Sequence, residues 1–340
     1  MFTILRITLL ALLLSASASA LAKKDLPFST VYVLGTSLSD EGNAFIQCGM
    51  QSVPPYDNLT PQLFAPGDSP YARGGHHFSN GATWVEKLAK ELGVANSVLP
   101  VRRNPQGTNY AQAGTTAFPF PDVLPCRTTF SNQVDEVLAR GSIPADALVV
   151  VEIGANDVFN ALDAFVGALV FGLAFDEAKA FAIGNVINPA ANVTANGIHD
   201  LIDGGATKVL WANVPNIGLT PAVTLTAEQL AQPPFNLPSF LFIAVATEFA
   251  TTFNVAVENA LQGKIDSGTI VKLDLFNSLT QLVMSDMRGL NNVSELCVTP
   301  NVPPFACGKP DEYLFWDSIH PTKAGHELFA EDALRALGLM

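Results

Sequence analysis

The stretch Ala147-Leu148-Val149-Val150-Val151-Glu152-Ile153-Gly154-Ala155-Asn156-Asp157 contains the most apolar candidate strand of the chain. Its first seven residues lack the alternation of apolar and polar positions that a half-exposed strand shows. A nearly continuous apolar run is typical of a parallel strand that is buried on both faces. The Gly-Ala-Asn-Asp that follows would then lie at the carboxyl edge of the sheet, where doubly wound folds bind their ligands.

Short apolar runs of this kind alternate with longer helical patterns along the chain, which predicts an α/β fold with a mostly parallel five-stranded sheet covered by helices on both faces. The predicted strands are Thr30–Leu34, Val98–Val101, Ala147–Ile153, Lys208–Ala212 and Thr269–Leu273. The predicted helices are Ala82–Leu92, Asn132–Arg140, Val158–Ala174, Glu177–Leu201 (broken or kinked at Pro189), Ser239–Leu261, Asn277–Met284 and Lys323–Leu337. Three long segments are predicted to be functional loops: Gln51–His77, Asn104–Arg127 and Thr220–Pro238.

Composition excludes two classes of protein. The chain has 340 residues, of which 49% are apolar and 14% charged, and its formal net charge is −13. Nucleic-acid binding is disfavoured because the phosphates must be neutralised by Lys and Arg. Intrinsic disorder is disfavoured because the apolar fraction and the 22 Phe are ample for a large core.

The first 22 residues have the pattern of a secretory signal peptide. Arg6 precedes the largely apolar run Ile7–Leu14, and small residues follow as far as Ala22. The apolar run is too short to span a bilayer, so we expect cleavage after Ala22, with Ala20 as the alternative. The mature chain, residues 23–340, would then form a single exported domain.

Export makes disulfides plausible for Cys48, Cys126, Cys297 and Cys307, for which three pairings exist. The short, Pro-rich segment between Cys297 and Cys307 favours that pair, which leaves Cys48 with Cys126; free thiols are the alternative. The sequence has no C-x-x-C motif and no Cys/His cluster, so we expect no metal site and no cofactor.

The apolar segment Phe165–Phe175 is too short to cross a membrane. We expect a buried helix there, and the alternative is a lipid-facing lid.

A candidate nucleophile follows the first predicted strand, in Gly35-Thr36-Ser37-Leu38-Ser39-Asp40-Glu41-Gly42-Asn43. The strand ends at Gly35, so Ser37 would be presented at the active edge of the sheet. Its backbone N–H, near the start of a helix, could also bind an oxyanion. A plain turn or an N-cap explains the motif equally well on its own.

A candidate base lies near the other end of the chain, in Asp317-Ser318-Ile319-His320-Pro321. A carboxylate three residues before an imidazole can hold one ring nitrogen and leave the other to act as a base. Two further residues are candidates for an oxyanion hole. The Asn156 amide would emerge at the same edge as Ser37, and Gly114 in Asn109-Tyr110-Ala111-Gln112-Ala113-Gly114 offers an unhindered N–H. The alternative is that Asn156 or Asp157 caps the helix that follows.

Taken together, these blocks resemble the GDSL/SGNH hydrolase family, whose Ser, Gly, Asn and His occur in the order of Ser37, Gly114, Asn156 and His320. The stretches Phe78–Glu86 and Asn213–Pro221 look most like the secreted phospholipase/lecithinase/haemolysin-type esterases. The resemblance covers essentially the whole mature chain. It implies a three-layer α/β/α sandwich of the flavodoxin-like type.

For function, the resemblance implies ester hydrolysis through an acyl-enzyme, with Ser37, Asp317 and His320 as the catalytic triad. The oxyanion hole would consist of Ser37, Gly114 and Asn156. The sequence departs from the family at one position, because the name-giving Asp before the nucleophile is Thr36 here. This replacement puts the hydrogen bonding of the nucleophile turn in question.

The many Phe, Leu and Ala residues favour a lipid-like ester, hence a carboxylesterase, lipase or phospholipase. An acyltransferase or a carbohydrate acetylesterase would use the same site. A catalytically degenerate lipid-binding or surface-binding protein is the alternative from another class. We expect a secreted monomer with no nucleic-acid partner and no stable membrane span.

Overall fold

The structure is a computed structural model that describes residues 27–49, 77–119, 126, 128–298 and 306–340. Its centre is a sheet of four parallel strands in the order β1-β2-β3-β4. The strands are β1 (Thr30–Gly35), β2 (Ala147–Glu152), β3 (Val209–Ala212) and β4 (Ile270–Leu273). All four coincide with predicted strands to within one residue at each end. The predicted signal peptide lies outside the described residues.

Successive side chains along each strand point to opposite faces of the sheet, as strand geometry requires. Val149 and Val151 of β2 pack with one cluster of buried side chains, and Leu148 and Val150 pack with the other. Every residue of β2 is buried. Its first five residues, Ala147 to Val151, are all apolar because helices cover the strand on both sides.

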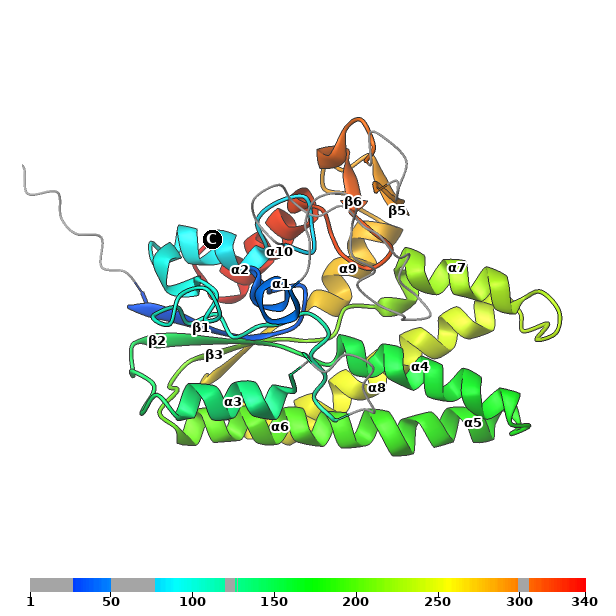
Figure 1. Cartoon of the computed structure of the whole chain (residues 1–340), viewed down its shortest axis with the longest axis horizontal. Coiled ribbons are helices and arrows are strands. Elements are labelled where there is room, and N and C mark those ends of the chain that lie inside the picture. Colours follow the sequence, from blue (N-terminus) through cyan, green and yellow to red (C-terminus); the bar gives the residue numbers. More distant parts are fainter. Residues whose placement is uncertain (1–26, 50–76, 120–125, 127, 299–305) are drawn as a thin grey trace, which may run out of the picture.

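Figure 1 shows these two helical layers, with α2, α9 and α10 above the sheet and α3, α6 and α8 below it. The helices are α1 (Asn43–Cys48), α2 (Trp84–Glu91), α3 (Phe130–Leu138), α4 (Ala155–Val170), α5 (Phe175–Ala182), α6 (Asn188–Asp203), α7 (Pro221–Leu230), α8 (Ser239–Asp266), α9 (Leu275–Met284) and α10 (Lys323–Ala336). The three-layer α/β/α prediction is confirmed.

The fifth position of the sheet differs from the prediction. The predicted strand Val98–Val101 is not a full strand: Ala95–Val98 form a short 3-10 turn, and Pro100 makes only an isolated parallel bridge with Asn109. The segment 108–112 lies beside β1 instead, where Val33 N donates to Thr108 O at 2.9 Å and Tyr110 N donates to Val33 O at 2.7 Å. The spatial order is therefore flavodoxin-like, with an irregular segment beside β1 in place of a full fifth strand. Its polar residues concealed it from a search for apolar runs.

The structure also differs from the prediction in the segment Thr220–Pro238, and it has an irregular helical turn near Pro189. The segment Thr220–Pro238 was expected to be a loop, but it contains α7, which starts at Pro221 because proline is favoured in the first turn of a helix. The break expected at Pro189 is present as a π-helical turn over Ile183–Ile187, immediately before α6. Proline cannot donate to the preceding turn, so the helical hydrogen bonds change register there.

A small parallel pair, β5 (Asn292–Leu296) and β6 (Tyr313–Phe315), precedes the loop that carries His320. Both disulfides have the pairing that the sequence favoured. Cys48 bonds Cys126 across 78 residues, and Cys297 bonds Cys307 across 10 residues. The first bridge joins the end of α1 to the region after Gly114.

The apolar segment Phe165–Phe175 divides into two parts. Phe165 is fully buried in α4, whereas Phe171 at the α4–α5 turn is 88% exposed. The buried-helix interpretation therefore holds for the first part only. By length and composition α8 could cross a membrane, but Phe249 and Phe253 on its inner face are fully buried in the core of this fold.

Candidate active site

Three side chains from distant segments form a continuous hydrogen-bonded chain. The Oγ atom of Ser37 lies 2.7 Å from Nε2 of His320, and Nδ1 of His320 lies 2.7 Å from Oδ2 of Asp317. Because the carboxylate can only accept at Nδ1, the proton resides on that nitrogen and Nε2 is free to accept from the serine hydroxyl. The arrangement has the connectivity of a Ser-His-Asp triad.

Hydrogen bonds within residues 316–320, the histidine loop, fix its conformation. Oδ1 of Asp317 accepts the backbone N–H groups of Ile319 at 2.8 Å and His320 at 2.7 Å, while Oδ2 remains for the imidazole. Trp316 N donates to His320 O at 2.7 Å and closes the loop. The Asp317 side chain is 6% exposed and that of His320 12%. The carboxylate is thus fully hydrogen-bonded, which fixes both its own orientation and that of the ring.

The stretch Phe78–Glu86, which had no assigned catalytic role, supports this loop from outside. Ser79 Oγ donates to Pro321 O at 2.8 Å, and Asn80 Oδ1 accepts Lys323 N at 2.7 Å. The neighbouring Phe78 ring lies 5.5 Å from the His320 ring. These contacts explain why the Phe-Ser-Asn block belongs with the site.

Asp40 ties the nucleophile turn to the segment that carries Gly114. Its Oδ1 accepts Gly42 N at 2.7 Å and Asn43 N at 2.6 Å, whereas its Oδ2 accepts Ala113 N at 2.8 Å. Burial raises the pKa of Asp40 to about 6, although these N–H donors oppose the shift. The residue before Gly114 is thereby fixed relative to the helix that follows Ser37.

Two of the candidate oxyanion residues, Gly114 and Asn156, lie close together at the start of α4. Gly154 has φ +112°, and a Cβ atom there would lie 2.3 Å from the Phe253 ring, so the turn from β2 into α4 requires glycine. It places Asn156 so that Nδ2 donates to Thr115 O at 2.8 Å, one residue beyond Gly114. Gly114 has φ +79°, a conformation that also favours glycine. Asn156 and the Gly114–Thr115 segment are therefore neighbours.

Asp157 fixes the segment that follows Thr115 by accepting hydrogen bonds from its backbone. Its carboxylate accepts Ala117 N at 2.9 Å and Phe118 N at 3.1 Å, and it is 1% exposed. Burial raises the pKa of Asp157 to about 7. The N-cap role considered for Asp157 is not seen, because Gly154 occupies the N-cap position of α4.

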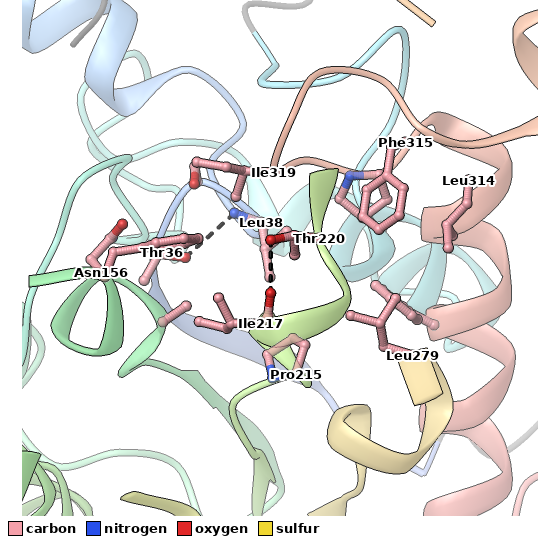
Figure 2. A pocket seen from close by; sticks show the side chains of 15 residues that line it. Thr36, Leu38, Asn156, Pro215, Ile217, Thr220, Leu279, Leu314, Phe315 and Ile319 are labelled. Atoms are coloured by element: carbon pink, nitrogen blue, oxygen red, sulfur yellow. Dashed lines mark hydrogen bonds between the residues drawn. The ribbon is translucent and has the colours of Figure 1, made fainter. Parts of the chain in front are cut away.

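A pocket of about 550 Å³, its mouth included, opens beside Ser37. Figure 2 shows Asn156, Ile217, Leu279 and Phe315 around it, and most of its wall is apolar. Ile217 and neighbouring Pro215 come from the Asn213–Pro221 stretch, so this block of sequence forms part of the wall.

One group of metal-ligating residue types occurs in the described part of the chain, namely Glu41, His77 and Glu86, whose ligand atoms lie within 4.8 Å of one another. Oε2 of Glu86 already accepts Thr83 N at 2.7 Å and Thr83 Oγ1 at 3.0 Å, and lies 2.8 Å from Nε2 of His77. Glu86 and His77 are thus engaged as the cap of α2 and its ion pair, whereas the buried Oε2 atom of Glu41 has no hydrogen-bond partner within the described residues.

Comparison with known proteins identifies the family. The family model described as GDSL-like lipase/acylhydrolase matches residues 31–333. The chain belongs to this family. A GDSL esterase/lipase of Arabidopsis thaliana is 23% identical over 357 residues, covering 92% of this chain and 90% of the relative. The phosphatidylcholine-sterol acyltransferase of Aeromonas hydrophila is 24% identical over 349 residues, covering 90% and 89%.

A GDSL-like lipase from Parabacteroides merdae is similar in structure, with a TM-score of 0.40 and 12% sequence identity over 92% of this chain and 96% of that one. Family membership makes this GDSL protein an ester-bond hydrolase.

The structure brings together every residue that the sequence placed in the site: Ser37, Gly114, Asn156, Asp317 and His320. Sequence reasoning missed Glu152, which lies beneath the nucleophile turn, because it stands within an apolar strand. A buried charged residue in such a run is itself a signal, since burial of an unpaired carboxylate is costly.

Proposed function

We propose that this GDSL protein is an exported serine carboxylester hydrolase that cleaves lipid-like acyl esters through Ser37, His320 and Asp317. One observation carries the proposal: the hydrogen-bonded chain Ser37–His320–Asp317, with 2.7 Å at each link. An isolated serine hydroxyl is a poor nucleophile at neutral pH, and the adjacent imidazole supplies the base that it needs.

In the first half-reaction, Ser37 Oγ attacks the ester carbonyl while its proton passes to Nε2 of His320. Asp317 stays ionised and stabilises the imidazolium. The backbone N–H groups of Ser37 and Gly114 and the Asn156 amide stabilise the oxyanion, for which Asn156 must release Thr115 O. The tetrahedral intermediate collapses, and the proton moves from His320 to the departing alcohol.

In the second half-reaction, water attacks the acyl-enzyme and gives its proton to His320. The carboxylic acid leaves, and the proton returns to Ser37 Oγ. The apolar pocket wall beside Ser37 supports an acyl chain as the group that is held there.

Reaction with a serine-directed fluorophosphonate tests the assignment. We expect one label per chain on Ser37, and hydrolysis of p-nitrophenyl esters that is lost in the Ser37→Ala variant while the thermal unfolding midpoint is retained. Ser294→Ala, at an exposed serine, is the matched control and should behave like the unsubstituted protein. Turnover by Ser37→Ala would contradict the assignment, and absence of labelling would favour a non-catalytic lipid-binding protein.

A second candidate is acyl transfer to an alcohol, which differs only in the group that resolves the acyl-enzyme. The relative named phosphatidylcholine-sterol acyltransferase supports it. Hydrolysis of a p-nitrophenyl ester with and without an acceptor alcohol separates the two. Transfer predominates if the alcohol raises the rate of p-nitrophenol release and an acylated alcohol accumulates.

The protein is proposed to be exported after cleavage of residues 1–22. The disulfides Cys48–Cys126 and Cys297–Cys307 support an oxidising compartment. N-terminal sequencing of the exported protein checks this, with Lys23 expected as the first residue.

A further inference from the structure

The nucleophile turn differs from that of its family at Thr36, where the family carries an aspartate. Thr36 is 1% exposed, so its side chain is enclosed by protein. An aspartate at this position would place a carboxyl group inside the turn itself.

The Thr36 hydroxyl contacts the carboxyl group of Glu152, on the adjacent strand. Gly35 of β1 pairs with Glu152 of β2 in the sheet register. Thr36 Oγ1 lies 3.0 Å from both carboxyl oxygens of Glu152, and Thr36 N donates to Oε2 at 3.1 Å. Ser39 Oγ also donates to Oε2, at 3.2 Å. The carboxyl group therefore holds the turn on both sides of Ser37.

The placement of Glu152 is unusual in energetic terms. It is the only ionisable residue of β2 and is 2% exposed. Its hydrogen-bond donors are the neutral groups of Thr36 and Ser39, and within the described residues no Lys or Arg forms an ion pair with it. Burial raises the pKa of Glu152 to about 7, and the donors and His320 oppose that shift. Burying a carboxyl group without a cation lowers the stability of the fold. Its presence here therefore indicates a functional role.

The backbone around it is fitted to that carboxyl group. A Cβ atom on Gly35 would lie 2.7 Å from Glu152 O and 3.1 Å from Glu152 Oε2. Only glycine lets β1 approach so closely at the point where the turn begins. Trp84 Nε1 donates to Ser39 Oγ at 3.1 Å and leaves the serine proton for Glu152.

We propose that Glu152 is the positioning residue of the nucleophile turn: the carboxyl group that the family carries at the position of Thr36 is supplied here from β2, with Thr36 as its hydrogen-bond donor. The inference rests on the proposed role of Ser37. It makes Thr36 and Glu152 a complementary pair, in which one residue must carry the carboxyl group and the other a hydroxyl group.

Exchanging the two residues tests this. Thr36→Asp alone places two carboxyl groups in one buried space, and Glu152→Thr alone leaves the donors of the turn without an acceptor. We expect each single variant to lower kcat and the rate of fluorophosphonate labelling by roughly tenfold to a hundredfold, with KM changed less than about twofold. The double variant T36D/E152T should recover to within about fivefold of the unsubstituted protein. Losses in the double variant that equal or exceed the product of the single losses would overturn the proposal.

Glu152→Gln keeps the fold testable if the single variants fail to fold. Glutamine preserves size and one acceptor oxygen but cannot ionise, so the thermal midpoint should stay near that of the unsubstituted protein while the labelling rate falls and its pH dependence near neutrality changes. Glu91→Gln, at an exposed glutamate, is the matched control. An unchanged labelling rate and pH profile in Glu152→Gln would overturn the proposal.

The two proposals fail separately. Turnover that persists in Ser37→Ala overturns the proposed function. Loss of turnover in Ser37→Ala combined with no rescue in T36D/E152T overturns only the role of Glu152.

Discussion

Ser37 and His320 are 283 residues apart in sequence, yet Oγ of the first lies 2.7 Å from Nε2 of the second. Ser37 follows the first strand of the parallel sheet, and His320 lies in the loop between β6 and α10. Ser37 lies just beyond the carboxyl end of β1, where doubly wound sheets bind their ligands, and the loop after β6, a strand of the separate two-stranded sheet, brings His320 to it.

Asp317→Asn should lower kcat by about 10⁴-fold with little effect on folding. The amide can donate to Nδ1 of His320 and so stabilise the tautomer that carries its proton on Nε2, where it cannot accept the Ser37 proton. Steady-state kinetics with a p-nitrophenyl ester measure the loss. Asp311→Asn, with a side chain that is 62% exposed, serves as the control. A loss smaller than tenfold would remove Asp317 from the triad.

Asn156→Ala should lower kcat by about 10²–10³-fold while KM changes little, because an oxyanion donor acts mainly in the transition state. The same variant loses the hydrogen bond to Thr115 O, so the unfolding midpoint is measured alongside. A rise in KM with kcat preserved would instead assign Asn156 to ground-state binding.

Ala155→Leu should shift the preference for acyl chain length. Ala155 lines the pocket at the partly exposed first residue of α4, so a larger side chain takes up pocket space without filling the core. We expect kcat/KM for an octanoyl ester to fall by roughly tenfold or more relative to an acetyl ester. Ala180→Leu is the control, because it makes the same substitution at an exposed position on α5 that does not line the pocket. Equal effects on both esters would show that the acyl chain lies outside this pocket.

Asp157→Asn should change how stability depends on pH. Burial raises the pKa of Asp157 from 3.8 to about 7, so this group contributes stability that is fully present below about pH 4 and is lost as pH rises towards 7. Asparagine does not ionise, so the variant does not lose stability in this pH range through residue 157. The free energy of unfolding of the unsubstituted protein relative to the variant should therefore fall between pH 5 and pH 8, by roughly 1–3 kcal/mol.

Urea unfolding at the two pH values measures this difference. Asp146→Asn, at an exposed aspartate, is the control and should leave the pH dependence unchanged. Parallel stability curves for Asp157→Asn and the unsubstituted protein would show that Asp157 is ionised in both states.

The sheet was predictable where apolar residues determine it. β2 and β3 are fully buried, mainly apolar runs, and β4 is a short run with buried apolar residues at both ends, so the boundaries of all three follow from the pattern to within one residue. The edge segment 108–112 was not, because its pairing with β1 depends on backbone hydrogen bonds and on buried polar groups such as Asn109 and Gln112. The helix α7 was missed because Pro and Thr indicate both loops and helix starts.

The site was predictable where a motif carries its own chemistry. Ser37, Asn156 and His320 each stand at a strand end or in a short loop, with a reactive group that has few other uses there. Glu152 was not predictable as a partner of Thr36, because the contact joins residues that are 116 positions apart across two strands. The supporting contacts of Ser79 and Asn80 likewise form only after the chain has closed.

The nucleophile follows the first strand, and its base follows the last one. The catalytic site is therefore incomplete during most of synthesis. A ribosome makes the nucleophile turn early and the histidine loop late, so a nascent chain contains Ser37 without a group to remove its proton. Under the proposed mechanism, an isolated N-terminal fragment that ends before His320 lacks the same base. The hydrolase therefore stays inert towards the esters of its producing cell until the polypeptide is long enough to include His320 and to fold around it.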